Sequence, residues 1–156
     1  MNPEEFVKMV EDGFRSGLTS GNPDYVTDLF TQDARSYFVG HSPPDYGRDA
    51  IREHVKRYFD EVTNANLGFK LLVSQGNTIV AESNETGIRK NGKPFNIRGC
   101  AVWLVQNDKI KEFRFYEIDV LFSASSDILN AKGRPLVPLE ESGAPRGDAD
   151  FWENTK

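Results

Sequence analysis

Hydrophobic and polar positions alternate over much of residues 78–122, which is the pattern of long β-strands. Three segments carry it, at 79–88, 95–105 and 110–122. The dipeptides Asn91-Gly92 and Asn107-Asp108 separate the segments, and both favour tight turns. The pattern therefore predicts an antiparallel meander of three long strands. A similar alternation at 67–74 adds a strand before it.

Earlier in the chain the apolar positions recur with a helical period, over 3–21, over a short segment from 24, and over 49–62. The pairs Asn2-Pro3 and Asn22-Pro23 are helix-start signals, because Asn caps a helix and Pro suits its first turn. A strand is expected at 34–39, and two consecutive prolines make 41–47 a loop. The order predicts an α+β fold in which a curved sheet wraps around three helices and leaves a pocket between them.

Alternation along the last two strands sorts their side chains onto two faces. The first face carries Ala101, Trp103, Val105, Phe113, Phe115 and Glu117, and the second carries Cys100, Val102, Leu104, Arg114, Tyr116 and Ile118. Both sets are mainly apolar, whereas a sheet with one wet face alternates apolar with polar residues. We expect the helices to cover one face and a second subunit or the tail to cover the other. The sequence thus predicts a homodimer through the outer face of the sheet.

The length of 156 residues fits one domain, which we place at 1–122. The remainder, 123–156, is rich in Ser, Gly, Pro and acidic residues, and we interpret it as a C-terminal tail that packs on the domain or on the dimer partner. A disordered tail is the alternative that its composition leaves open.

Charge and composition exclude several classes of function. The net charge of −5 argues against nucleic acid as a partner, and no segment approaches the roughly 18 apolar residues of a membrane span. The acidic N-terminus does not resemble a signal peptide and Cys100 is the single cysteine, so we expect a cytoplasmic protein. Two histidines and scattered acids have no metal-site spacing, and there is no Gly-rich nucleotide loop; we expect no metal and no cofactor.

Four blocks carry a resemblance to a known family: LTSGNPDYVTDLF at 18–30, Asp33-Ala34, GRDAIR at 47–52, and DKI at 108–110 leading into FRFY at 113–116. Together they resemble the SnoaL-like branch of the NTF2-like superfamily over roughly residues 5 to 122. The resemblance implies the cystatin-like cone fold of ketosteroid isomerase, limonene epoxide hydrolase and polyketide cyclases. It indicates fold more than function, because this fold hosts many activities.

The catalytic groups of those relatives are not retained. Matching the ketosteroid isomerase blocks puts the general base at Phe38, the tyrosine at Phe14 and the second acid within 99–101, where no acid occurs. The limonene epoxide hydrolase groups fall on Glu82, Asn84 and Phe115, and the acid of polyketide cyclases also falls on Phe115. Close copies of these mechanisms are therefore not expected.

The same matching implies that Glu82 and Asn84 face the interior together with Glu117. Carboxyl groups among aromatic rings have raised pKa values, so Glu82 and Glu117 are the candidate acid–base pair. His41, at the start of the Pro-rich loop, is a further candidate. The expected wall of the substrate pocket consists of Phe14, Phe38, Tyr58, Asn84, Trp103, Phe113 and Phe115. His54 is expected to be a packing residue.

Each candidate has a structural alternative: the glutamates could lie at the rim or pair with Arg98 or Arg114, and His41 could be an exposed loop residue. Three functions follow. In the first, the chain is a cofactor-free enzyme that transfers protons on a small apolar or oxygenated ligand, by isomerisation, dehydration or cyclisation. Alternatively, it binds such a ligand without chemistry, or it is a dimeric interaction domain whose pocket is filled by its own side chains. We prefer the first.

Overall fold

The computed structural model describes residues 1–39 and 42–117, and both His41 and the predicted tail lie outside the described residues. The helices are α1 (Pro3–Ser20), α2 (Asp24–Thr27) and α3 (Arg48–Glu61). The strands are β1 (Phe30–Val39), β2 (Asp45–Tyr46), β3 (Val62–Gln75), β4 (Thr78–Arg89), β5 (Pro94–Gln106) and β6 (Lys109–Glu117).

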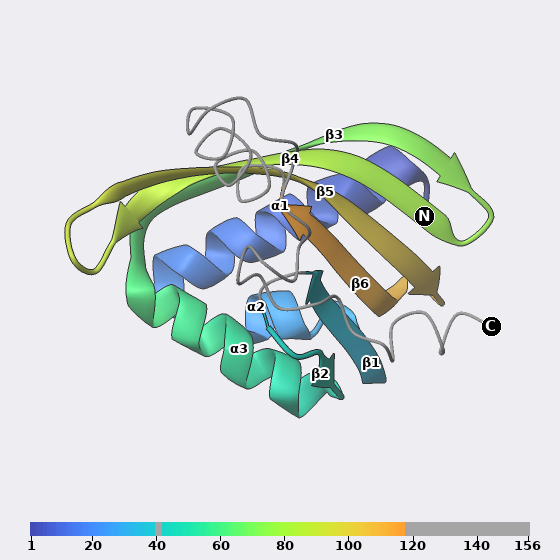
Figure 1. Ribbon diagram of the computed structural model, residues 1–156. Coiled ribbons are helices and arrows are strands. Elements are labelled where there is room, and N and C mark those ends of the chain that lie inside the picture. Colours follow the sequence, from blue (N-terminus) through green and yellow to red (C-terminus); the bar gives the residue numbers. More distant parts are fainter. Residues whose placement is uncertain (40–41, 118–156) are drawn as a thin grey trace, which may run out of the picture.

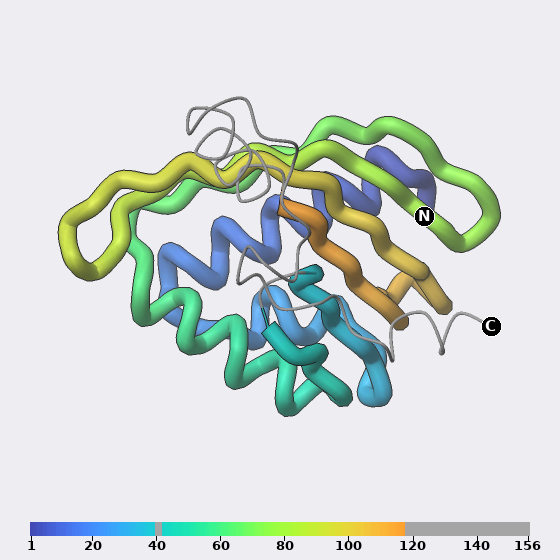
Figure 2. The backbone as a smooth tube through the Cα atoms, in the orientation of Figure 1, coloured from blue at the N-terminus to red at the C-terminus, as the bar shows by residue number. Residues whose placement is uncertain are grey.

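The six strands form one sheet in the order β2-β1-β6-β5-β4-β3. Only the β1–β6 pair is parallel. In Figure 1 the long strands β3, β4 and β5 arch over α1, while α2 and α3 lie on the same concave side. Figure 2 traces the same path from α3 directly into the curved strands. The predicted α+β class, with helices packed on a curved, mostly antiparallel sheet, is confirmed.

Local signals set the helix ends. The Asn2 side chain accepts a hydrogen bond of 2.8 Å from the Glu5 backbone N–H, and the Asn2 backbone N–H donates one of 3.2 Å to the Glu5 carboxylate, which makes a capping box. Gly21 ends α1 with φ of 73°, a left-handed conformation that costs glycine little. The predicted start of the first helix therefore holds. The second helix begins at Asp24 as predicted, but Pro23 is its N-cap residue and no side chain caps it.

Three strands differ from the prediction. The strand predicted at 67–74 spans Val62–Gln75, because it begins directly after α3 and pairs with β4 from Arg89 onward. The first strand begins at Phe30 instead of residue 34, since its early part pairs with β6 at Ile110. The predicted loop at 41–47 includes the two-residue strand β2, in which Asp45 pairs with Ser36. This short pairing follows Pro44 directly, where a proline no longer removes a needed donor.

The core lies between α1 and the concave face of the sheet. Trp103 is 1% exposed and contacts Phe6 of α1 edge-on, with ring centroids 5.7 Å apart, and Phe69 of β3 at 5.0 Å. The Phe69 backbone N–H also donates to the Glu11 carboxylate of α1 at 2.6 Å. Together these contacts fix the helix against β3 and hold the tryptophan in the middle of the fold.

The register of β4 contradicts one sequence prediction. Ala81 lies opposite Ala101, which in turn lies opposite Phe115, and both alanines are fully buried. Odd-numbered residues of β4 therefore face the interior. Glu82 lies opposite Cys100 on the outer face and is exposed. The prediction that Glu82 and Asn84 face the interior is wrong.

Turn geometry explains the difference. Gly92 has φ of 82°, and the Arg89 N–H donates to the Lys93 carbonyl at 2.9 Å, so the loop holds the three residues 90–92. A two-residue Asn91-Gly92 turn would instead pair position 90 with Lys93 and place Glu82 opposite Ala101. A shift of one residue in the pairing turns every side chain of the strand to the other face, so that register would have pointed Glu82 inward.

The next hairpin does have a two-residue turn. Asn107 and Asp108 have φ of 51° and 56°, as a type I′ turn requires, and Gln106 pairs with Lys109. A register shift between Leu104 and Val105 then brings Phe113 opposite Trp103. The predicted interior set of aromatic residues on β5 and β6 is thereby confirmed.

Candidate active site

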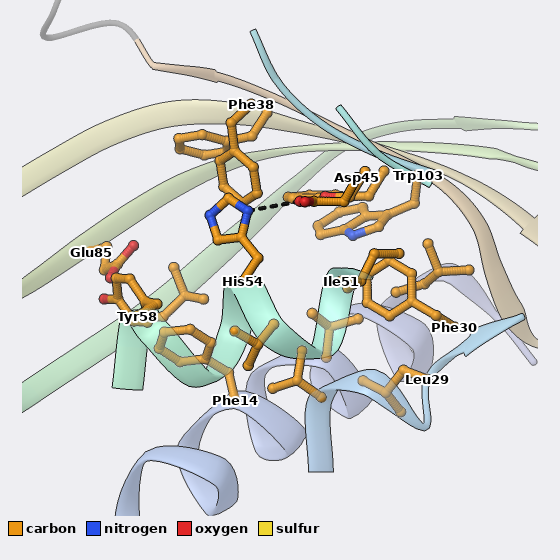
Figure 3. A pocket seen from close by; sticks show the side chains of 18 of the residues that line it. Phe14, Leu29, Phe30, Phe38, Asp45, Ile51, His54, Tyr58, Glu85 and Trp103 are labelled. Carbon is orange, nitrogen blue, oxygen red and sulfur yellow. Dashed lines mark hydrogen bonds and ion pairs between the residues drawn. The ribbon is translucent and has the colours of Figure 1, made fainter. Parts of the chain in front are cut away.

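A cavity of about 150 Å³ lies between the concave face of the sheet and the helices. Its wall is mainly apolar, and aromatic rings make up much of it (Figure 3). The lining residues are Val10, Phe14, Val26, Leu29, Phe30, Ser36, Phe38, Asp45, Ile51, His54, Val55, Tyr58, Leu67, Phe69, Glu85, Trp103, Ile110, Phe113 and Phe115. Against this apolar wall, the few polar groups carry the chemistry of the site.

His54 and Asp45 form a hydrogen-bonded pair on the cavity wall. His54 Nδ1 lies 2.7 Å from Asp45 Oδ2, and both side chains are largely buried. An ionised carboxylate can only accept a hydrogen bond, so Nδ1 carries the proton and donates a hydrogen bond to Asp45. The ring also lies against Phe38, with centroids 4.7 Å apart. The imidazole is thus held in one tautomer, and its Nε2 points away from Asp45 (Figure 3).

Glu85 and Tyr58 provide two further polar groups, drawn together on one side of the cavity in Figure 3. Among the residues that the structure describes, Glu85 Oε1 and Tyr58 Oη are buried without a hydrogen-bond partner. Tyr58 lies four residues after His54 on α3, so one helix face presents both side chains to the cavity.

The environment of Glu85 favours its neutral form. Burial is the main cause, the Glu117 carboxylate adds to it, and Arg89 acts in the opposite direction; the net effect raises the pKa of Glu85 to about 7. Glu117 belongs to the same sheet face, because it lies opposite Gly99 while Gly99 lies opposite Ser83. A carboxyl group with such a pKa can act as an acid near neutral pH.

The predicted site residues separate into three groups. Six of the seven predicted wall residues line the cavity: Phe14, Phe38, Tyr58, Trp103, Phe113 and Phe115. The seventh, Asn84, is exposed on the outer face together with Glu82, in a recess that also contains Lys70 and Arg98. Glu117 faces inward as predicted without lining the cavity, and its carboxylate neighbour is Glu85 instead of Glu82.

Sequence reasoning missed Asp45, His54 and Glu85. His54 lies three residues after Ile51 and four before Tyr58, which is helical spacing on the apolar face, so its inward direction could have been found. Its description as a packing residue is incomplete, because it also bonds Asp45. Asp45 has no comparable signal, since only the β1–β2 pairing brings it beneath α3.

The outer face of the sheet holds Cys100. Burial, followed by the nearby Glu82 carboxylate, raises the pKa of this thiol, which makes it a poor nucleophile. Exposed Leu104 and half-buried Tyr116 share the face, and the homodimer through it stays a prediction.

The part of the chain that the structure describes has neither a metal site nor a membrane-spanning helix. Within 1–39 and 42–117, no three His, Cys, Asp or Glu side chains gather as metal ligands would. No helix in these ranges combines the length and apolar character of a membrane span.

Solved structures with this fold have low sequence identity to the chain. A hypothetical protein from Catenulispora acidiphila DSM 44928 with a ketosteroid isomerase-like fold, solved in complex with trimethylamine, is 19% identical, with a TM-score of 0.62 over 72% of this chain and 84% of its own. A candidate SnoaL-like polyketide cyclase from Jannaschia sp. CCS1 is 15% identical, with a TM-score of 0.63 over 85% and 92%.

A third structure is SalBIII, an epoxide hydrolase/cyclase-like enzyme with a role in pyran ring formation in the polyether salinomycin. It is 18% identical, with a TM-score of 0.61 over 73% of this chain and 91% of its own. These likenesses show the NTF2-like fold. No curated protein sequence is significantly similar to this chain.

The family model of the SnoaL-like domain matches residues 10–113, which is most of the described chain and includes every residue that lines the cavity except Phe115. The match begins within α1 and ends within β6, so it covers part of these two elements and all the elements between them. The chain therefore belongs to the SnoaL-like family.

Proposed function

We propose that this protein is a cofactor-free enzyme that transfers protons on a small, mostly apolar, oxygenated molecule. One observation carries the proposal: an imidazole oriented by a carboxylate and a carboxyl group with a raised pKa line the same apolar cavity. Such a pair of groups, an oriented imidazole that can accept a proton and a carboxyl group that can donate one, is typical of acid–base catalysis.

His54 is the general base in this proposal. Its Nδ1–H is engaged by Asp45, so the neutral imidazole offers the lone pair of Nε2. Nε2 removes a proton from the carbon next to a substrate carbonyl. The electron pair of that C–H bond forms a C=C bond, and the π pair of the carbonyl moves onto the oxygen. Asp45 then stabilises the imidazolium that forms.

Glu85 is the general acid. In its neutral form it donates to the oxygen on which negative charge develops, and the apolar wall strengthens this interaction by excluding water. Return of the proton to a different carbon of an unsaturated substrate gives isomerisation. In dehydration the enolate re-forms the carbonyl and expels a β-hydroxyl group, which leaves as water with the proton that His54 has taken up. Attack of the enolate carbon on a second electrophilic carbon of the same molecule gives cyclisation.

The family supports this class of reaction without deciding among its members. SalBIII and the candidate polyketide cyclase from Jannaschia suggest cyclisation as one of them. At under 20% identity their likeness shows the fold, so the reaction of this chain is inferred from its own residues.

Proton removal, the step common to all three reactions, can be tested with cyclohexanone in D₂O, by following deuterium incorporation next to the carbonyl by NMR. We expect the protein to accelerate exchange, and H54Q to reduce the acceleration by roughly 100-fold, a typical contribution of a general base. E82Q, altered on the outer face of the same sheet, is the matched control and should leave the rate unchanged. Exchange that is no faster than in buffer, or that is unaffected by H54Q, contradicts the proposal. Cyclohexanone that binds without incorporating deuterium would favour a binding module.

A further inference from the structure

Two buried oxygens of the cavity lack a hydrogen-bond partner among the described residues. Buried side-chain oxygens are normally paired, and only four side-chain atoms in the described part of the chain are not. Tyr58 Oη and Glu85 Oε1 both line the one cavity, where they come from α3 and β4. Their coincidence in a single space indicates a polar atom of a ligand as the missing partner.

The chemistry of the two groups defines that atom. The Tyr58 hydroxyl donates readily, and Glu85 carries a proton below about pH 7. The charged groups around Glu85 are Glu117 on β6 and Arg89 on its own strand, with the His54–Asp45 pair also on the cavity wall. Two donors on the same side of the cavity match an acceptor such as a carbonyl oxygen (Figure 3).

The size of the cavity limits the rest of the ligand. A volume of about 150 Å³ is comparable to that of an apolar cavity that accommodates benzene. The wall beyond the two oxygens is formed largely by aromatic and aliphatic side chains, including Phe14, Phe38 and Phe113. One ring therefore fills the space, and the fused rings of a steroid exceed it.

We infer that the cavity takes an uncharged molecule with a single ring and one carbonyl oxygen, and that Tyr58 and Glu85 both donate hydrogen bonds to this oxygen. The inference rests on the proposed function, because it names the substrate class of the same site. It adds Tyr58 to the residues that contact the substrate and makes binding depend on the proton of Glu85.

Binding of three probes of similar size tests it, by NMR shift titration in H₂O at pH 6 and pH 8.5. Cyclohexanone has the carbonyl, methylenecyclohexane replaces the oxygen by carbon, and the cyclohexylammonium ion adds a positive charge. At pH 6 we expect cyclohexanone to bind about tenfold more tightly than methylenecyclohexane, about the worth of one or two hydrogen bonds. At pH 8.5 this preference should fall to about twofold, because Glu85 has then lost its proton.

Three variants test which side chains cause the preference for cyclohexanone over methylenecyclohexane. Y58F keeps the ring and should weaken cyclohexanone binding about fivefold with no change for methylenecyclohexane. E85Q keeps an N–H donor at every pH, so cyclohexanone binding should remain and become independent of pH. E82Q, on the outer face of the same strand, should behave as the unaltered protein.

Equal affinity for cyclohexanone and methylenecyclohexane at pH 6 would overturn the inference. So would cyclohexylammonium as the tightest probe with an affinity that rises with pH, because that pattern belongs to a cation site at an ionised Glu85. These binding measurements do not require turnover. If the protein does not accelerate exchange but binds the probes as expected, the proposed function fails and this inference stands. Exchange that depends on His54, while Y58F leaves cyclohexanone affinity unchanged and E85Q leaves its pH dependence unchanged, defeats this inference alone.

Discussion

Asp45 and His54 lie nine residues apart in the sequence and are joined by a 2.7 Å hydrogen bond across the gap between β2 and α3. Asp45 is held by the pairing of β2 with β1, and His54 by the second turn of α3. Neither element fixes the imidazole alone. The bond therefore ties the orientation of the proposed base to the position of the loop that follows β1.

The first prediction concerns this bond. In D45N the amide can donate to Nδ1 and so favour the tautomer whose Nε2 carries the proton, which removes the lone pair from the cavity side. We expect the cyclohexanone exchange rate to fall roughly 100-fold with little change in cyclohexanone affinity. Nitrogen-15 NMR of the His54 ring should show the tautomer reversed. An unchanged ring spectrum together with an unchanged rate would contradict a positioning role for Asp45.

The second prediction is a pH dependence of stability. The pKa of Glu85 is about 7 in the folded protein and 4.5 as the reference value, so between these pH values the folded state binds more protons than the unfolded state. Stability must then fall as pH rises through this window, by about 3 kcal/mol in total. E85Q lacks the carboxyl group and should lose this decline, which makes it more stable than the unaltered protein at pH 8.

Urea denaturation between pH 4.5 and pH 8 measures the effect. E82Q is the control, because Glu82 is exposed on the same strand. Parallel stability curves for E85Q and the unaltered protein would show that Glu85 does not carry the raised pKa.

The third prediction compares two glycines of the sheet, Gly99 on β5 and Gly68 on β3. A Cβ at Gly99 would lie 2.5 Å from Phe115 Cζ and 2.6 Å from the Tyr116 carbonyl oxygen, so G99A must displace the Phe115 ring that lines the cavity. We expect a loss of about 1–3 kcal/mol in unfolding free energy and weaker cyclohexanone binding. At Gly68 a Cβ meets nothing within 4 Å, and G68A should stay within about 0.5 kcal/mol. Equal effects of the two substitutions would contradict the packing at Gly99.

The fourth prediction concerns the thiol of Cys100. Since burial and the Glu82 carboxylate raise its pKa, little thiolate forms at pH 8. Alkylation by iodoacetamide should be at least about fivefold slower than in the urea-unfolded protein. E82Q removes the smaller of the two causes and should accelerate the reaction about twofold. Alkylation of the folded protein at the unfolded rate would show that the thiol is fully accessible and unperturbed.

Much of the fold followed from local patterns. Asn2, Pro3 and Glu5 start a helix through contacts within one turn, and Gly21 ends it. The interior aromatic set with Trp103, Phe113 and Phe115 followed from alternation along the strands, and the resemblance to the SnoaL-like family agreed with it.

Local patterns did not predict which glutamate is the acidic residue of the site. Glu82 and Glu85 lie three residues apart on one strand, so a shift of one residue in its pairing decides which of them faces the cavity. That shift depends on whether the Asn91-Gly92 turn has two or three residues in its loop. A two-residue and a three-residue loop can both be built on Asn91-Gly92, so the sequence allowed either register.

By itself the sequence determined the elements, their order and the apolar wall, because helix caps, turns and alternation depend on near neighbours. Only the tertiary structure decided which polar groups meet in the cavity: it turned Glu85 inward and Glu82 outward, and it brought Asp45 beneath His54. The physical reason is that strand register and helix–strand contacts are set by packing across the whole sheet, where one residue of displacement changes every neighbour.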